Sequence, residues 1–212
     1  PGGTTRMGYG LTDTMPLSTQ KQHVDLFRKL LLRRRLLRYA LPGPAYVPFC
    51  GDGDIAKELY ADRQVYAADL DSNRVKNAQE AMPSAVVRQA DCDGWPFADL
   101  GIPPFTVCDF DAYADPYASF RAFWHSAPKG SKMVLFFTDG HRQGISRSKR
   151  LILPDGTHRQ LDDVSERRQT HNFYFRRTVV SWFMNYVAPW EVVKLQHYLR
   201  GWMLYWGAVV EL

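Results

Sequence analysis

Five short apolar runs that end in glycine or a carboxylate constrain the fold of this chain more than any other feature. They cover residues 46–49, 65–69, 85–91, 105–109 and 132–139, and helix-like segments separate most of them. In an open parallel sheet the carboxyl ends of the strands share one edge, where ligands bind. One terminal Asp could simply cap the next helix, but five such ends favour a common ligand edge. The pattern predicts an α/β fold with a mostly parallel sheet.

The first run leads into a glycine turn. Cys50-Gly51-Asp52-Gly53 follows the run, and apolar residues from Ile55 to Tyr60 then have helical spacing. Glycines tolerate positive φ and let a ligand approach the backbone, while the free N–H groups at a helix N-terminus attract polar or anionic atoms. A G-x-G pair also fits a tight turn that binds nothing. Asp69 lies 16 positions after Gly53, where a carboxylate can accept hydrogen bonds from a ribose diol.

Residues 40–140 resemble class I S-adenosylmethionine (SAM)-dependent methyltransferases. Pro48-Phe49-Cys50-Gly51-Asp52-Gly53 is similar to the P-F-x-G-x-G form of their first motif, which is common in enzymes that methylate exocyclic amines of nucleic acids. The resemblance implies a seven-stranded Rossmann-like sheet with an antiparallel last strand. It also implies a SAM site in which the turn holds the methionine part, Asp69 the ribose and Asp91 the adenine. The implied cofactor-binding residues are Phe49, Cys50, Gly51, Asp52, Gly53, Asp69, Leu70, Asp91, Cys92 and Asp109.

Two positions bear on this cofactor site. The family has an acid just before P-F, whereas this chain has Val47, so Asp52 or the N-terminal segment is expected to contact the amino end of SAM. Asp71 is a rival of Asp69 for the ribose, although it stands where the family has the first residue of the next helix.

The fourth motif indicates the substrate class. Residues 108–117, Cys-Asp-Phe-Asp-Ala-Tyr-Ala-Asp-Pro-Tyr, resemble the D-x-D-P-[FY]-G-S-P stretch of tRNA guanine-N2 methyltransferases, and Thr138-Asp139 resembles their later T-D. An exocyclic amine is a poor nucleophile, so a carboxylate that accepts its hydrogen bonds and a ring stacked on the base would align it. Asp109 and Asp111 are the predicted acceptors and Tyr113 is the predicted stacking ring. Ala112 and Ala114-Asp115 depart from the family pattern.

Composition limits the classes of protein that fit. The 212 residues carry a net charge of +5, with 45% apolar residues, which permits nucleic-acid binding and one good core. No apolar run approaches the ~20 residues of a membrane span, and no signal sequence opens the chain. Three cysteines without metal-ligand spacing predict reduced thiols, no metal site and a cytoplasmic location.

Residues 1–40 divide into an arm and a basic helix. The helix is expected to begin at Thr19, with Gln22 completing a capping box. Its apolar side is expected to consist of Val24, Phe27, Leu30, Leu31 and Leu37. The remaining surface is basic, with Arg28, Lys29, Arg33, Arg34, Arg35 and Arg38. It is either a solvated helix face or a ridge that contacts phosphates.

Residues 141–177 follow the core as a basic insertion. They contain nine Lys and Arg residues with interleaved aromatics, and Pro154-Asp155-Gly156 predicts a hairpin turn between short apolar pieces. Such a segment beside the carboxyl edge suits a lid that binds nucleic acid, or an ordinary surface excursion. The three histidines of this segment are interpreted as surface groups.

Residues 178–212 are expected to close the same sheet. A helix is predicted over 178–188, and strands over 191–199 and 203–212, as in the last hairpin of the family. The tail tryptophans at 182, 190, 202 and 206 are expected in the core.

Together these patterns predict a SAM-dependent methyltransferase that acts on an exocyclic amine of a nucleic-acid base, with RNA favoured over DNA. Two alternatives use the same fold: methylation of a small molecule, and a non-catalytic protein that binds nucleic acid. The glycines and acids of the motifs argue against the second alternative, whereas Val47 and Ala112 leave it open.

Overall fold

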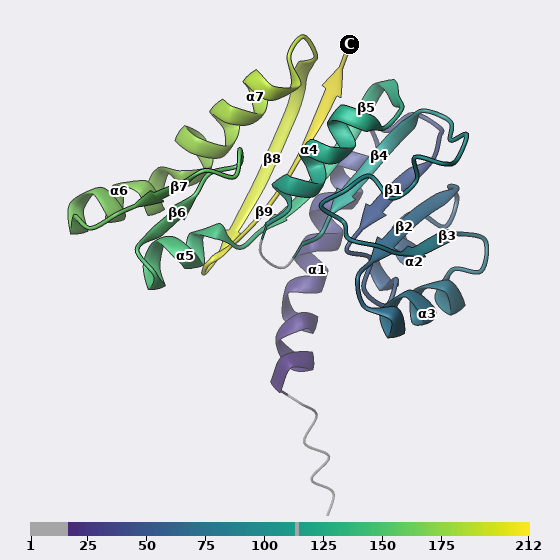
Figure 1. The fold of residues 1–212 in the computed structure, drawn as a ribbon, viewed down its shortest axis with the longest axis horizontal. Helices are drawn as coiled ribbons and strands as arrows, with labels where there is room; N and C mark the ends of the chain where they lie inside the picture. Colours follow the sequence, from purple (N-terminus) through teal and green to yellow (C-terminus); the bar gives the residue numbers. More distant parts are fainter. Residues whose placement is uncertain (1–16, 113–114) are drawn as a thin grey trace, which may run out of the picture.

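The computed structural model describes residues 17–112 and 115–212, with side chains from residue 26 onward. Seven strands form one sheet in the order β3-β2-β1-β4-β5-β9-β8 (Figure 1). The first five strands are parallel to one another, and β9 is antiparallel to both β5 and β8. The strands are β1 (Ala45–Pro48), β2 (Val65–Asp69), β3 (Val86–Gln89), β4 (Phe105–Phe110), β5 (Lys129–Asp139), β8 (Glu191–Arg200) and β9 (Met203–Glu211). The predicted seven-stranded sheet with a closing hairpin is confirmed.

Helices cover both faces of the sheet. On one face lie α1 (Leu17–Leu37), α2 (Asp54–Leu59) and α3 (Ser72–Ala81), packed on aliphatic strand residues such as Val47 and Val107. On the other face lie α4 (Tyr117–Ser126) and α7 (Ser181–Val187). Successive strand residues point to opposite faces, so Val107 and Asp109 face α1 whereas Cys108 and Phe110 face α4.

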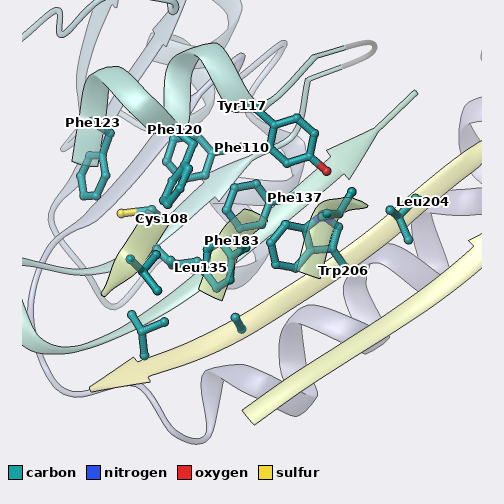
Figure 2. Packing of buried hydrophobic residues seen from close by; sticks show 14 of the residues in the cluster. Cys108, Phe110, Tyr117, Phe120, Phe123, Leu135, Phe137, Phe183, Leu204 and Trp206 are labelled. Atoms are coloured by element: carbon teal, nitrogen blue, oxygen red, sulfur yellow. The ribbon is translucent and has the colours of Figure 1, made fainter. Parts of the chain in front are cut away.

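The core on the α4 side is mainly aromatic. The ring of Phe137 on β5 stacks on Phe110 at 5.2 Å and on Trp206 of β9 at 4.1 Å between centroids (Figure 2). The prediction of a core position is confirmed for Trp206, and Trp182 and Trp190 pack against the same cluster. It is wrong for Trp202, which is 42% exposed because it lies in the turn between β8 and β9.

The N-terminal helix differs from its predicted form. It begins at Leu17, so Thr19 lies inside the helix and cannot be its N-cap. Among residues 26–37 the buried side chains are Leu30, Leu32, Arg33 and Leu36. Phe27 and Leu31 are 67% and 36% exposed, so their predicted place on the apolar side is wrong, and the Val24 side chain lies outside the described part. The helix faces the sheet with a stripe that includes one arginine, which apolar periodicity alone does not reveal.

Residues 141–180 form a more regular unit than the sequence suggests. It consists of α5 (His141–Arg147), a two-stranded hairpin of β6 (Arg150–Ile152) and β7 (His158–Gln160), α6 (Val164–Phe173) and the π-helix η1 (Tyr174–Val180). The predicted hairpin is confirmed, with Gly156 at φ 90° in its turn. The helix α6 has no buried residue, so its sequence lacks the apolar period that would have predicted it. The helix expected over 178–188 is the end of η1 followed by α7.

Candidate functional site

The glycine turn after β1 holds three residues at positive φ. Phe49 has φ 58°, Gly51 has φ 55° and Gly53 has φ 86°. A Cβ at Gly53 would lie 3.1 Å from Met82 Cε and 3.3 Å from Ala78 Cα, so this glycine allows α2 and α3 to pack closely. A Cβ at Gly51 would meet no atom within 4 Å. Gly51 therefore offers open backbone to a ligand, and Gly53 supports the turn.

Asp69 ends β2 with its carboxylate directed at this turn. Its two oxygens accept hydrogen bonds from the backbone N–H of Gly51 at 2.9 Å and of Asp71 at 3.0 Å. Asp71 is the N-cap of α3 and accepts from the N–H of Asn73 at 2.8 Å, so its carboxylate already has a structural partner. Leu70 between them is 69% exposed. The turn, the carboxylate and this exposed apolar side chain lie together at the carboxyl edge.

The residues after β3 complete this part of the edge. Asp91 is exposed and accepts a hydrogen bond from the N–H of Asp93. The Cys92 sulfur is buried 3.4 Å from the Phe49 nitrogen. Burial raises the pKa of the Cys50 thiol to about 12 and that of Cys92 to about 11, so both are neutral packing groups near neutral pH. Asp52 accepts from the amide of Asn77 on α3, and its contact to the amino end of SAM stays a prediction.

Asp109 on β4 is fully buried, and its carboxylate is already paired. Arg33 of α1 donates from Nε and Nη2 to its two oxygens, both at 2.6 Å, and the Tyr60 hydroxyl donates at 2.7 Å. Burial alone opposes the charged form of Arg33, but Asp109 and Asp111 outweigh burial and raise the pKa of the guanidinium. The interpretation of Arg33 as part of a phosphate ridge or a solvated face is therefore wrong. Arg33 lies between Leu30 and Leu36 on the apolar stripe of the helix, and this position was the sequence signal for a buried arginine with an acid partner.

Asp111 lies just beyond the end of β4 and is more accessible. Lys29 Nζ lies 2.8 and 3.1 Å from its two oxygens, and 15% of the Asp111 side chain is exposed. Burial would raise the pKa of Asp111, but Lys29 and Arg33 hold it below its usual value. Tyr46 on β1 pairs with Cys108 on the adjacent strand β4. Phe49 and Asp111 each lie three positions further along the chain, so each follows the end of its own strand. Tyr113 lies outside the described residues.

A second polar cluster lies at the end of β5. The carboxylate of Asp139 accepts from the hydroxyls of Tyr117 at 2.5 Å and Tyr174 at 3.0 Å, and from the N–H of His141 at 2.7 Å. His141 is buried, with Nε2 at 3.6 Å from Asp115 Oδ1. The interpretation of His141 as a surface group is wrong, because α5 turns this side chain into the fold directly after β5. A histidine two residues after a strand-ending acid was the signal for this position.

The described part of the chain contains neither a metal-binding cluster nor a membrane-spanning helix. No group of three or more His, Cys, Asp or Glu side chains there is placed to hold a metal ion. No helix within residues 17–112 and 115–212 is long and apolar enough to cross a membrane.

No protein-family model and no curated protein matches this chain, but solved structures do. The plantazolicin methyltransferase BpumL with bound SAH is similar, with a TM-score of 0.59, 10% identity and coverage of 92% of this chain and 88% of that one. The N-methyltransferase NodS from Bradyrhizobium japonicum, also with SAH, has a TM-score of 0.60 at 9% identity and covers 94% and 93%. TrmK from M. capricolum, with its natural cofactor product SAH, has a TM-score of 0.53 at 8% identity and covers 87% and 67%. This chain has the fold of these SAH-bound proteins.

Proposed function

We propose that the chain is a SAM-dependent methyltransferase. One observation carries the proposal: the open backbone at Gly51 faces a carboxylate, Asp69, that two backbone N–H groups hold in place. The residues fit the cofactor, because a backbone without Cβ can approach it closely, an acid suits its ribose and the exposed Leu70 suits its adenine. When bound, SAM supplies a methyl group on a positively charged sulfur. Six further residues would complete the cofactor site: Phe49, Cys50, Asp52, Gly53, Asp91 and Cys92.

We infer that the substrate group is an exocyclic amine on a nucleic-acid base. Charge supports this inference, because residues 141–177 carry nine Lys and Arg against four Asp and Glu. Their net charge of +5 equals that of the whole chain, so the remaining residues are neutral together. A concentrated positive surface suits a polyanion. RNA is favoured over DNA because the fourth motif resembles that of tRNA guanine-N2 methyltransferases.

Asp111 is the better of the two predicted acceptors for that amine. Its carboxylate is ionised at neutral pH and has some exposed surface, so it can accept an N–H bond and stabilise positive charge on the nitrogen. Asp109 has no exposed surface and already binds Arg33 and Tyr60. We assign Asp109 a positioning role, since it fixes α1 and thereby Lys29 beside Asp111.

Methyl transfer from radiolabelled SAM to bulk tRNA, rRNA, DNA and a metabolite extract tests the function. We expect label in RNA, and we expect Asp111→Asn to lower turnover by about 100-fold, in the range of lost acid–base or electrostatic groups, with SAM affinity within a few fold. Asp62→Asn, which removes an exposed acid 49 positions before Asp111, serves as the matched control. A wild-type protein that binds no SAM by calorimetry would refute the proposal.

A small-molecule substrate is the alternative, and it has its own support. The similar BpumL is by name a plantazolicin methyltransferase, so the same fold is compatible with targets other than nucleic acid. Label that appears in the metabolite extract and not in any nucleic acid would favour this alternative and leave the cofactor assignment intact.

A further inference from the structure

A groove is lined by residues of the β6–β7 hairpin and of the helices α6, η1 and α7. Figure 1 shows the hairpin beside these continuous helices. It consists of two adjoining hollows of about 300 Å³ and about 260 Å³. Leu153, Arg177 and Thr178 line both hollows, so the two are halves of one groove. Phe173 lies in the first half and Trp182 in the second. None of these residues belongs to the cofactor site.

The centre of the groove combines a cation with an exposed ring. The Arg177 guanidinium lies 4.6 Å from the centroid of Phe173, whose side chain is 42% exposed. Within residues 26–112 and 115–212, no carboxylate lies within ion-pair distance of Arg177, whereas Arg159 on the opposite wall pairs with Glu166. A guanidinium stacked on an aromatic ring keeps its edge N–H groups free for phosphate, and an exposed ring can stack on a base.

The walls of the groove are held in place. Arg121 of α4 donates from Nη1 to the carbonyl of Pro154 at the hairpin tip, and Gly156 donates to the Leu153 carbonyl at 2.8 Å. At the far end of the groove, the Trp182 ring lies 5.5 Å from Tyr117. Tyr117 is the last residue of the fourth motif and the first residue of α4, and its hydroxyl donates a hydrogen bond to Asp139 at the carboxyl edge. The groove is therefore preformed and ends beside the residues that follow β4 and β5.

We propose that this groove binds a single-stranded segment of the nucleic-acid substrate next to the target base, an inference that rests on the proposed function. Arg177 contacts a backbone phosphate, and Phe173 stacks on an exposed base. The basic helix α1 is less suited to this task, because Lys29, Arg33 and Arg34 already pair with acids. The single strand is favoured over a duplex because bases in a duplex offer no free faces to the Phe173 ring.

Fluorescence anisotropy with a labelled single-stranded RNA of about 12 nucleotides, titrated at several salt concentrations, tests the groove. Arg177→Ala should weaken binding and reduce the slope of log affinity against log salt by about 0.7, the value for one phosphate on a single strand. Phe173→Leu should weaken binding by about fivefold or more through lost stacking and leave the slope unchanged. Lys76→Ala, which removes an exposed charge from α3, should change neither quantity.

Thermal melts and SAM calorimetry on each variant separate the possible failures. If SAM binds but Arg177→Ala and Phe173→Leu bind the RNA like wild type, the groove assignment is overturned and the methyltransferase proposal stands. A duplex of equal length that binds as tightly, or an acidic peptide that binds where RNA does not, also overturns it. If the protein binds no SAM, the proposed function is refuted. The RNA titrations of Arg177→Ala and Phe173→Leu then still decide whether the groove binds RNA.

Discussion

Asp69 and Asp71 are two residues apart, yet the structure gives their carboxylates different tasks. Asp69 faces the glycine turn and holds two backbone N–H groups, whereas Asp71 caps α3. Both acids follow the same strand and both are acceptable ribose ligands by type. Their backbone partners distinguish them, because a carboxylate that caps a helix is oriented by that helix.

Asp69→Asn and Asp71→Ala should therefore separate cofactor binding from stability. Loss of a charge-assisted hydrogen bond is worth about 1.5–3 kcal/mol, so Asp69→Asn should weaken SAM binding about tenfold or more by calorimetry. Asp71→Ala, which removes the cap, should lower the free energy of unfolding by about 1 kcal/mol and leave SAM affinity within a few fold. Equal losses of SAM affinity in the two variants would contradict this assignment.

The buried environment of His141 predicts a pH dependence of stability. Burial alone would lower its pKa, but Asp115 and Asp139 outweigh burial and raise it above its usual value. Tyr117, Tyr174 and Arg142 are further polar groups in this cluster. A raised folded-state pKa stabilises the fold at pH below the unfolded value of about 6.5, and the contribution is lost as pH rises through the folded pKa.

An NMR titration should place the His141 midpoint above about 6.5. Asp115→Asn should lower that midpoint, because it removes the acid nearest Nε2. His141→Gln should destabilise the protein more at pH 6 than at pH 9, as measured by denaturant unfolding. A midpoint at or below the ordinary value in the wild type would show that burial dominates.

At the scale of elements, α1 is attached to the sheet by a buried ion pair as well as by leucines. Arg33 reaches Asp109 on β4, and Tyr60 joins the same carboxylate from the end of α2. The fork of a guanidinium matches both carboxylate oxygens, so one residue fixes the position and rotation of the helix. That rotation places Lys29, one turn earlier, beside Asp111.

Arg33→Met should destabilise the protein by about 3–5 kcal/mol, because it leaves the Asp109 carboxylate buried without a cation. Arg33→Met combined with Asp109→Leu should recover much of this loss, since both charges are then absent. Arg35→Met, an exposed arginine on the same helix, should change stability by less than about 0.5 kcal/mol. Denaturant unfolding measures all three, and similar losses for Arg33→Met and Arg35→Met would exclude a special role for the buried pair.

At the scale of the whole molecule, the closing hairpin joins the sheet to the insertion. Trp206 on β9 stacks on Phe137 of β5 and also contacts Phe175 of η1 and Phe183 of α7. One ring thus connects the parallel sheet, the π-helix and the last helix. The aromatic core extends from the sheet to the base of the insertion, which lets the insertion form a preformed wall.

Trp206→Ala should lower the free energy of unfolding by about 3–5 kcal/mol, as for other buried large-to-small changes. Trp202→Ala, in the exposed turn of the same hairpin, should cost less than about 1 kcal/mol. Guanidinium unfolding followed by circular dichroism measures both. Comparable losses would mean that the hairpin contributes through its backbone pairing and that the Trp206 ring is not central.

The elements of the sheet and the first part of the site were predictable from the sequence, because they depend on local patterns. Apolar runs that end in glycine or acid define β1, β2, β4 and β5. The turn from Gly51 to Gly53 also follows from its residues, since glycine accepts positive φ values, whereas the positive φ of Phe49 does not follow from its residue type. The roles of Asp69 and Asp91 toward a cofactor stay predictions.

The partners of the charged side chains were decided only by the tertiary structure. Arg33 stands in one run of arginines with Arg34 and Arg35, and only the fold shows that it alone among these three is buried, against Asp109. His141 looks like an exposed histidine until α5 turns it toward Asp115. The physical reason is that backbone conformation is set by neighbours along the chain, whereas the cost of burying a charge is offset by a partner from a distant segment, which only the folded chain brings within reach.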